Sequence, residues 1–217
     1  MDLERGLNPQ QREAVLAPDG PALVIAGAGS GKTRVLTYRI AHLIERGVPA
    51  DAILAVTFTN KAAGEMRERA ARVLGQDALG LFLGTFHSIC ARLLRIYGDA
   101  IGLDRRFVIF DDDDKMALVT RILKDQQVPE RLFAPRAVAT HIDRAKNLGQ
   151  GPDEYRAGDI LGDVVARAYA EYQKRLGDSA ALDFGDLLVC GLRVATHERI
   201  GALLRARFRH VLVDEYQ

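Results

Sequence analysis

A glycine-rich run, AGAGSGKT at residues 26–33, joins an apolar segment to an amphipathic one. Glycines let the backbone curl so that successive N–H groups point inward at phosphate oxygens, and a following helix adds the positive end of its dipole. In such a loop Lys32 reaches the outer phosphates of a nucleoside triphosphate, and the hydroxyl of Thr33 is placed for magnesium. The run therefore predicts a site for a nucleoside triphosphate.

The loop departs from the usual pattern at one position. The pattern GxxxxGK[ST] begins with glycine, whereas this chain has Ala26 there, so the loop must accommodate a methyl group. A glycine-rich turn that precedes a lysine by chance is the alternative interpretation. It is disfavoured because a strand pattern precedes the loop and a helix pattern follows it in register.

Two carboxylates follow the apolar pattern at the end of the sequence, VLVDEYQ at residues 211–217. The carboxyl end of a strand is where an open α/β sheet carries its ligand chemistry. Asp214 is suited to hold magnesium, and Glu215 to accept a proton from an attacking water. A solvated acidic turn is the alternative, but the phosphate loop in the same chain favours the catalytic interpretation.

Strand and helix patterns alternate over most of the chain. The expected strands are 22–25, 53–58, 81–85, 107–110 and 210–213, and the expected helices are 9–16, 32–47, 60–74 and 86–97. This alternation predicts an α/β fold in which a parallel sheet is covered by helices on both faces.

The alternation fails between Asp111 and about Leu182, where only helix patterns occur, at residues 114–125, 135–147 and 162–176. We expect this block to be an all-helical insertion that leaves one sheet connection and returns near Asp183. The four aspartates at 111–114 could hold a cation. A helix cap is the favoured interpretation, because acidic groups at the start of a helix complement its dipole.

The composition is that of an ordinary globular protein. The 217 residues include 30 Lys and Arg against 29 Asp and Glu, so any nucleic-acid site must be a local groove. Cys90 and Cys190 are too few for a disulfide framework or a zinc cluster, and we expect them to pack as small apolar side chains. No run is long enough to span a bilayer and the N-terminus is unlike a signal peptide, so the expected location is cytoplasmic.

Several motifs resemble the N-terminal part of the UvrD/Rep/PcrA group of superfamily-one DNA helicases, over nearly the whole chain. The motifs are LNPQQREA at 7–14, TFTNKAA at 57–63 with Met66, GTFHS at 84–88, LDFGDLL at 182–188 and DEYQ at 214–217. The resemblance implies a P-loop RecA-like sheet flanked by helices. Its parts are a first RecA-like core at 1–110, the helical insertion at 111–182, and a return to the core at 183–217 that ends in the Walker B motif.

The resemblance also implies roles for individual residues. Gln11 would read the edge of adenine, and Arg34 would act against the nucleotide. The implied nucleotide-binding residues are Gln11, Gly27, Ala28, Gly29, Ser30, Gly31, Lys32, Thr33 and Arg34. Lys32, Asp214 and Glu215 are the implied catalytic residues, and Thr33 and Asp214 the implied magnesium ligands.

The implied DNA-binding residues are Phe58, Asn60, Thr85 and His87. Phe58 and His87 follow strand ends, where each could offer a flat face to an unstacked base. The surrounding motif favours this platform for Phe58, whereas for His87 a platform and a core role stay equally open. Asn60 is a helix cap, a phosphate contact or both. Gly64 stands where many relatives carry a basic side chain, which weakens one expected backbone contact.

The resemblance implies an ATP-dependent helicase that moves three-prime to five-prime along single-stranded DNA, with ATP and Mg²⁺. The implied partners are single-stranded DNA, single/double-strand junctions and DNA-repair or replication proteins, without a membrane. Basic residues of the insertion, Lys146 among them, would contact duplex DNA. We expect the chain to be a fragment that lacks the second motor domain and has little turnover. A helicase-like subunit of a nuclease complex and a nucleotide- and DNA-binding module without turnover are the alternatives.

Overall fold

The computed structural model describes residues 6–75, 80–156 and 158–216. Its contacts divide the chain into two compact units. The first unit comprises Met1–Ile89 and Gly201–Gln217, and the second comprises Cys90–Ile200. The functional boundaries expected at 110/111 and 182/183 stay a prediction, since the second unit extends to either side of the helical block.

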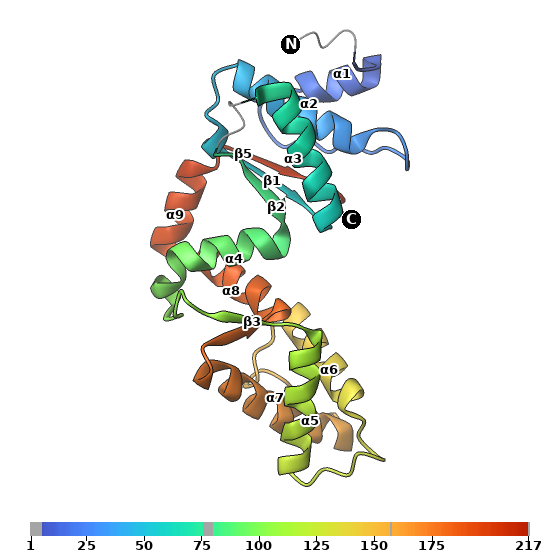
Figure 1. Cartoon of the computed structure of the whole chain (residues 1–217), viewed down its shortest axis with the longest axis vertical. Coiled ribbons are helices and arrows are strands. Elements are labelled where there is room, and N and C mark those ends of the chain that lie inside the picture. The colour runs from blue at the N-terminus through green and yellow to red at the C-terminus, as the bar shows by residue number, and fades with distance from the viewer. Residues whose placement is uncertain (1–5, 76–79, 157, 217) are drawn as a thin grey trace. The chain divides into compact units, whose positions relative to one another are not determined.

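The first unit contains a three-stranded parallel sheet in the order β2-β1-β5. Its strands are β1 (Ile53–Thr57), β2 (Phe82–Thr85) and β5 (His210–Val213), with β1 in the centre (Figure 1). Both neighbours pair with β1 in parallel. The parallel sheet predicted from the alternation of strands and helices is therefore confirmed, and the carboxyl ends of all three strands meet at one edge.

Helices cover this sheet. The helices of this part of the chain are α1 (Pro9–Leu16), α2 (Lys32–Glu45), the short 3₁₀ helix η1 (Ala50–Ala52) and α3 (Asn60–Leu74). α2 and α3 pack on one face through an apolar cluster of Ile40, Leu43, Ile53, Ala55, Ala63, Met66 and Leu83. Each large apolar side chain in such a cluster contributes about 1.5–3 kcal/mol through burial. This α/β arrangement is consistent with the expected RecA-like fold.

The expected strand at residues 22–25 is wrong. These residues form no strand, and the side chains of Leu23 and Ile25 are 69% and 89% exposed. A strand needs the N–H and C=O groups of a neighbour in addition to an apolar sequence. No strand within 6–75, 80–156 and 158–216 pairs with this segment, although β5 is an edge strand and pairs on one side only, with β1.

The second unit is mainly helical. Two helices, α4 (Phe86–Tyr97) and α9 (Glu198–Arg207), belong partly to each unit. The elements that lie wholly in the second unit are η3 (Gly98–Ile101), β3 (Val108–Phe110), α5 (Asp112–Asp125), α6 (Pro135–Asn147), α7 (Ile160–Asp178), β4 (Ala181–Asp183) and α8 (Phe184–Thr196). Among the described residues from 115 to 175 there is no strand, so the helical prediction for this block is confirmed. No helix of the described chain is long and apolar enough to cross a membrane.

The strand expected at 107–110 exists as β3, but it does not join the main sheet. β3 pairs in parallel with β4, and Val108 lies opposite Ala181 in this two-stranded sheet. α5, α6 and α7 pack around a core in which Ile142, Tyr172 and Leu176 are fully buried. β3 and β4 therefore tie the two ends of the helical block together.

The aspartates at 111–114 cap α5, as predicted. The Asp111 side chain accepts a hydrogen bond from the backbone N–H of Asp114 at 2.9 Å, and the Asp114 side chain accepts one from the N–H of Asp111 at 3.2 Å. This reciprocal pair satisfies two donors that the helix itself leaves open.

The two cysteines are free and partly buried. Burial raises the pKa of the Cys90 thiol, and it is also the largest cause that raises the pKa of Cys190. Both side chains are therefore neutral thiols at physiological pH, which fits the packing role expected from the sequence.

Candidate nucleotide-binding site

The phosphate loop at residues 26–31 needs glycine at two positions. Gly29 and Gly31 have φ angles of +75° and +88°, in the left-handed region that other residues rarely adopt. A Cβ atom on Gly31 would also lie 2.7 Å from Nε2 of Gln11. Ser30 closes the turn, because its N–H and its hydroxyl both donate to the carbonyl of Gly27, at 3.3 Å and 2.7 Å.

The helix that follows the loop begins without a side-chain cap. Gly31 occupies the N-cap position of α2, and no side chain accepts from its first turn, whereas Asn8, Thr59 and Asp111 cap α1, α3 and α5. The first N–H groups of α2 are thus open to an external acceptor such as a phosphate oxygen.

Lys32 is the first residue of α2 and its side chain lies over the loop. Its ammonium donates to the carbonyl oxygens of Ala26 at 3.2 Å and Gly27 at 3.4 Å. Both are weak bonds to the loop's own backbone, because one distance is at the upper end of the normal N–H···O range and the other lies beyond it. A phosphate group in the loop would offer the ammonium a charged acceptor in their place, and such bonds are about twice as strong.

The loop and the end of β5 meet through Thr33 and Asp214. The Thr33 hydroxyl donates to Oδ2 of Asp214 at 3.3 Å. Asp214 is buried, and its N–H donates to the carbonyl of Val56 in β1 at 2.8 Å, which extends the pairing of β1 and β5 by one residue. The sheet thus holds the carboxylate against the loop, as the sequence predicts.

The donor set at this point fits magnesium. Mg²⁺ prefers oxygen ligands, and its octahedral geometry places neighbouring ligands about 3 Å apart. The hydroxyl of Thr33 and the carboxylate of Asp214 supply two such oxygens, 3.3 Å from each other. Among the described residues, no group of three or more His, Cys, Asp or Glu side chains could hold a metal ion.

Glu215 follows Asp214 at the edge of the site and is exposed. Its φ angle is +57°, which is uncommon outside glycine and turns its side chain away from the direction that a continued strand would give. Arg34, in the first turn of α2, is exposed too, and its guanidinium lies 5.7 Å from the centre of the Tyr38 ring. The catalytic role of Glu215 and the nucleotide contact of Arg34 stay predictions.

Gln11 links α1 to the phosphate loop, a contact that the sequence analysis missed. Its Oε1 accepts from the N–H of Asn8 at 3.0 Å, in a capping box, while its Nε2 donates to the carbonyl of Ser30 at 2.8 Å. One N–H and one lone pair of the amide remain. That pair of groups matches the N7 acceptor and the N6 donor of adenine.

The candidate DNA residues of the first unit differ in exposure. Phe58, just beyond β1, is 75% exposed, so the expectation that it is not a core residue is confirmed. Thr59 is the N-cap of α3 and accepts from the N–H of Ala62 at 3.1 Å. Asn60 is therefore not the cap, and its contact with a phosphate stays a prediction.

Thr85 and His87 are less accessible. Thr85 is buried, and its hydroxyl accepts a hydrogen bond from the N–H of Ser88 at 3.2 Å, at the start of α4. His87 is half-buried and has contacts within the protein. If the Thr85 hydroxyl contacts DNA, it must do so while it also accepts the bond from Ser88. The DNA contacts of Thr85 and His87 both stay predictions.

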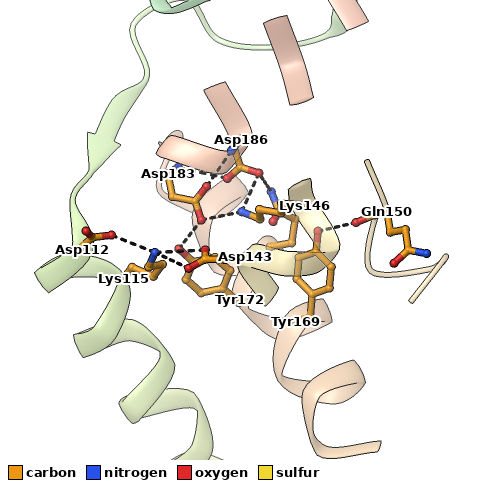
Figure 2. Close-up of polar contacts among 10 residues, drawn as sticks. Asp112, Lys115, Asp143, Lys146, Gln150, Tyr169, Tyr172, Asp183 and Asp186 are labelled. Carbon is orange, nitrogen blue, oxygen red and sulfur yellow. Dashed lines mark hydrogen bonds and ion pairs between the residues drawn. The ribbon is translucent and has the colours of Figure 1, made fainter. Parts of the chain in front are cut away.

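The prediction that Lys146 is an exposed basic residue is wrong. Lys146 is 3% exposed, and its ammonium lies 2.7 Å from Oδ2 of Asp183 and 2.8 Å from Oδ1 of Asp186 (Figure 2). The Tyr172 hydroxyl also donates to Asp183, at 2.8 Å. An ammonium buried between two carboxylates cannot reach DNA. We therefore withdraw the duplex contact proposed for this residue.

The environment of this cluster separates the pKa values of its two carboxyl groups. Burial opposes ionisation of Asp183, but the charge and hydrogen bond of Lys146, with bonds from the Asp186 N–H and Tyr172, lower its pKa overall. Burial is the largest cause that raises the pKa of Asp186, and the charge of Asp183 adds to it. Burial likewise raises the pKa of Tyr172, so its hydroxyl stays a donor.

Comparison with known proteins places this geometry in a family. Residues 7–217 match the model of the UvrD/REP helicase N-terminal domain. The chain is 45% identical over 218 residues to a protein of Bacillus subtilis (strain 168) named ATP-dependent DNA helicase PcrA. It is 47% identical over 222 residues to ATP-dependent DNA helicase UvrD1 of Mycobacterium bovis, and 41% identical over 221 residues to PcrA of Staphylococcus epidermidis.

These alignments cover 98% of this chain for the first two relatives and 99% for the third. They cover only 29%, 28% and 30% of the relatives themselves, so the chain spans less than a third of their length. A family model that matches almost the whole sequence, together with identity above 40%, establishes the relationship. The chain belongs to the UvrD/REP helicase N-terminal domain family.

Proposed function

We propose that the protein is an ATP-dependent DNA helicase that moves along single-stranded DNA, and that this chain provides its ATP-binding domain. The observation that carries the proposal is the 3.3 Å contact between Thr33 and Asp214, which brings the phosphate loop and the acidic strand end into one site. The names of the related PcrA and UvrD1 proteins support the same activity.

The residues of the site divide the chemistry of phosphoryl transfer between them. The open N–H groups of α2 and the ammonium of Lys32 bind the phosphate oxygens and offset their negative charge. Thr33 and Asp214 would hold magnesium, which neutralises charge that develops on the phosphates. Glu215 accepts the proton of the attacking water, and its exposed position at the edge of the site leaves it accessible to that water.

On the DNA side, we propose that Phe58 stacks on an unpaired base. A ring that is 75% exposed is costly to leave in water, and base stacking on such a platform does not depend on sequence. Phe58 leaves the same edge of the sheet that carries Asp214. The remaining parts of the proposal rest on the family resemblance. They are movement in the three-prime to five-prime direction, binding at single/double-strand junctions, a cytoplasmic location, and partner proteins in DNA repair or replication.

The proposal is tested with the complete protein that contains this chain. DNA-stimulated ATP hydrolysis and strand separation are measured for the wild type, Lys32→Ala and Glu215→Gln. Lys32→Ala should lose both activities together with ATP binding. Glu215→Gln should bind ATP normally and lose hydrolysis. Hydrolysis that persists in Glu215→Gln would remove this residue from the role of general base, and activity that persists in Lys32→Ala would disprove the site.

A further inference from the structure

Helix α1, which carries Gln11, has little apolar anchorage of its own. It has eight residues, and only Val15 among them is buried. Val15 packs in a small cluster with Leu7 and Val35. A helix of this length is unstable alone in water. Ala14 adds only a partly buried methyl group to this cluster, so the position of α1 depends also on the polar contacts at its two ends.

Arg39 of α2 holds the C-terminal end of α1. Its Nη1 donates to the carbonyl oxygens of Val15 at 2.8 Å and Ala17 at 2.6 Å. The last turn of α1 contains no basic residue, so the guanidinium supplies the positive charge that the negative end of the helix dipole favours. The side chain of Arg39 is only 12% exposed, which fits a fixed structural contact.

The N-terminal end of α1 lies on the phosphate loop. Gln11 is in its first turn and donates to Ser30, the residue before the glycine that caps α2. α2 thus carries Lys32 and Thr33 at its start and, two turns further, the arginine that fixes α1. Gln11 is therefore connected to the phosphate-binding groups in two ways. One is its direct hydrogen bond to Ser30 of the loop, and the other runs along α1 to Arg39 of α2.

We propose that Arg39 is a positioning residue for base selectivity. It fixes α1 so that the remaining N–H and lone pair of Gln11 face the base, and it has this role without a contact of its own with the nucleotide. Adenine offers an acceptor and a donor at the matching edge, whereas guanine offers two acceptors, so the correct placement of Gln11 favours ATP over GTP. The inference rests on the proposed function, since it assumes that nucleotide binds in the loop.

The test compares the dissociation constants of MgATP and MgGTP, measured by calorimetry on the whole chain. The variants are Arg39→Met, Gln11→Ala and the double variant. Arg39→Met should weaken ATP binding by about tenfold and change GTP binding by less than about twofold, because the phosphate contacts persist. The double variant should bind ATP no more weakly than Gln11→Ala alone, since both changes remove the same contact.

Two further variants separate positioning from general damage. Arg39→Lys keeps the positive charge and offers N–H donors without the planar guanidinium, and it should restore part of the selectivity. Arg46→Met is the matched control, because Arg46 is the C-cap residue of the same helix and its side chain is 47% exposed. Arg46 pairs with Asp19 at 3.3 Å, and Arg39 pairs with the same carboxylate at 3.7 Å. Arg46→Met should leave both dissociation constants unchanged. Circular dichroism checks that each variant is folded. If Arg39→Met is unfolded, the preference of Arg39→Lys for ATP over GTP tests the proposal instead.

Three results would overturn the proposal. Arg39→Met could weaken the binding of ATP and GTP equally, or the double variant could lose as much ATP affinity as the two single variants added together. If Arg39→Met is unfolded, a preference of Arg39→Lys for ATP over GTP equal to that of the wild type would be the third. Failure of the proposed function has a different signature. In that case Lys32→Ala binds both nucleotides as the wild type does, whatever the selectivity of the Arg39 variants.

Discussion

Replacement of Lys146 by methionine should destabilise the second unit by about 3–5 kcal/mol at neutral pH. The Lys146 side chain is 1% exposed, and its carboxylate partners Asp183 and Asp186 are 3% and 6% exposed. Methionine fills a similar volume, so the change removes the charge and its hydrogen bonds while it largely preserves packing. Two carboxylates are then left buried without a cation between them.

The magnitude follows from the contacts in Figure 2. Lys146 donates to two carboxylates at 2.7 Å and 2.8 Å, and a hydrogen bond to a charged group contributes about 1.5–3 kcal/mol. The two bonds together give about 3–6 kcal/mol, from which the desolvation cost of the ammonium must be subtracted. Donors that remain, the Tyr172 hydroxyl at 2.8 Å and the Gln173 amide at 3.0 Å, limit the loss.

The loss should shrink as the pH falls, because protonation removes the repulsion between the carboxylates. In the wild type, the lowered pKa of Asp183 contributes stability that is present above the ordinary Asp pKa of about 4 and lost as the pH falls through the folded-state pKa. The raised pKa of Asp186 contributes stability that is present below about pH 4 and lost as the pH rises through its folded-state pKa. Asp186→Asn should therefore reduce the decline in stability above pH 4.

Urea unfolding followed by circular dichroism measures the change, and hydrogen exchange in peptides of α6 and α8 assigns it to the second unit. Lys174→Met, at an exposed position of α7, is the control and should change stability by less than about 0.5 kcal/mol. The triple variant Lys146→Met, Asp183→Asn, Asp186→Asn should recover most of the loss. A loss below about 1 kcal/mol in Lys146→Met, or a triple variant as unstable as the single one, would refute the reasoning.

Other predictions concern the first unit. Phe58→Ala should cost about 1–3 kcal/mol of single-strand binding, measured by fluorescence anisotropy, and leave thermal stability unchanged; a loss of stability of about 3–5 kcal/mol instead would mark a core residue. Gly31→Ala should weaken MgATP binding in calorimetry, because alanine is strained at a φ of +88° and its Cβ meets Gln11; unchanged affinity would contradict this geometry. Thr59→Ala should lower stability by about 1 kcal/mol in urea, whereas Asn60→Ala should change it by less than half as much, and the reverse order would contradict the assigned cap.

Local patterns predicted much of the fold. The bounds of α3 and α6 agree with the expected 60–74 and 135–147, because apolar periodicity and Pro135 at the start of α6 mark them within the segment itself. The contact between Thr33 and Asp214 was predictable for a different reason. In a parallel sheet the carboxyl ends of the strands share one edge, so a strand at 22–25 would bring the loop to the end of β5; the two residues, 181 positions apart, meet even though 22–25 form no strand.

The predictions that failed concern contacts between residues that lie far apart in the sequence. The apolar residues at 22–25 look like a strand, but whether they pair depends on a neighbour that their own sequence does not specify. Lys146 looks like a surface charge at the end of an amphipathic helix. Its burial is decided by Asp183, 37 positions away, which only the folded second unit brings to it. The bond between Gln11 and Ser30 was missed for the same reason.

The most direct test of the account is calorimetric titration of the chain with ATP in the presence and absence of magnesium. We expect one ATP to bind with magnesium, weaker binding without it, and loss of binding in Lys32→Ala. Asp214→Asn should abolish the difference that magnesium makes, because it removes the charge of one of the two proposed ligands. Binding that is indifferent to Lys32, or a magnesium effect that persists in Asp214→Asn, would contradict the site assigned to the loop and the end of β5.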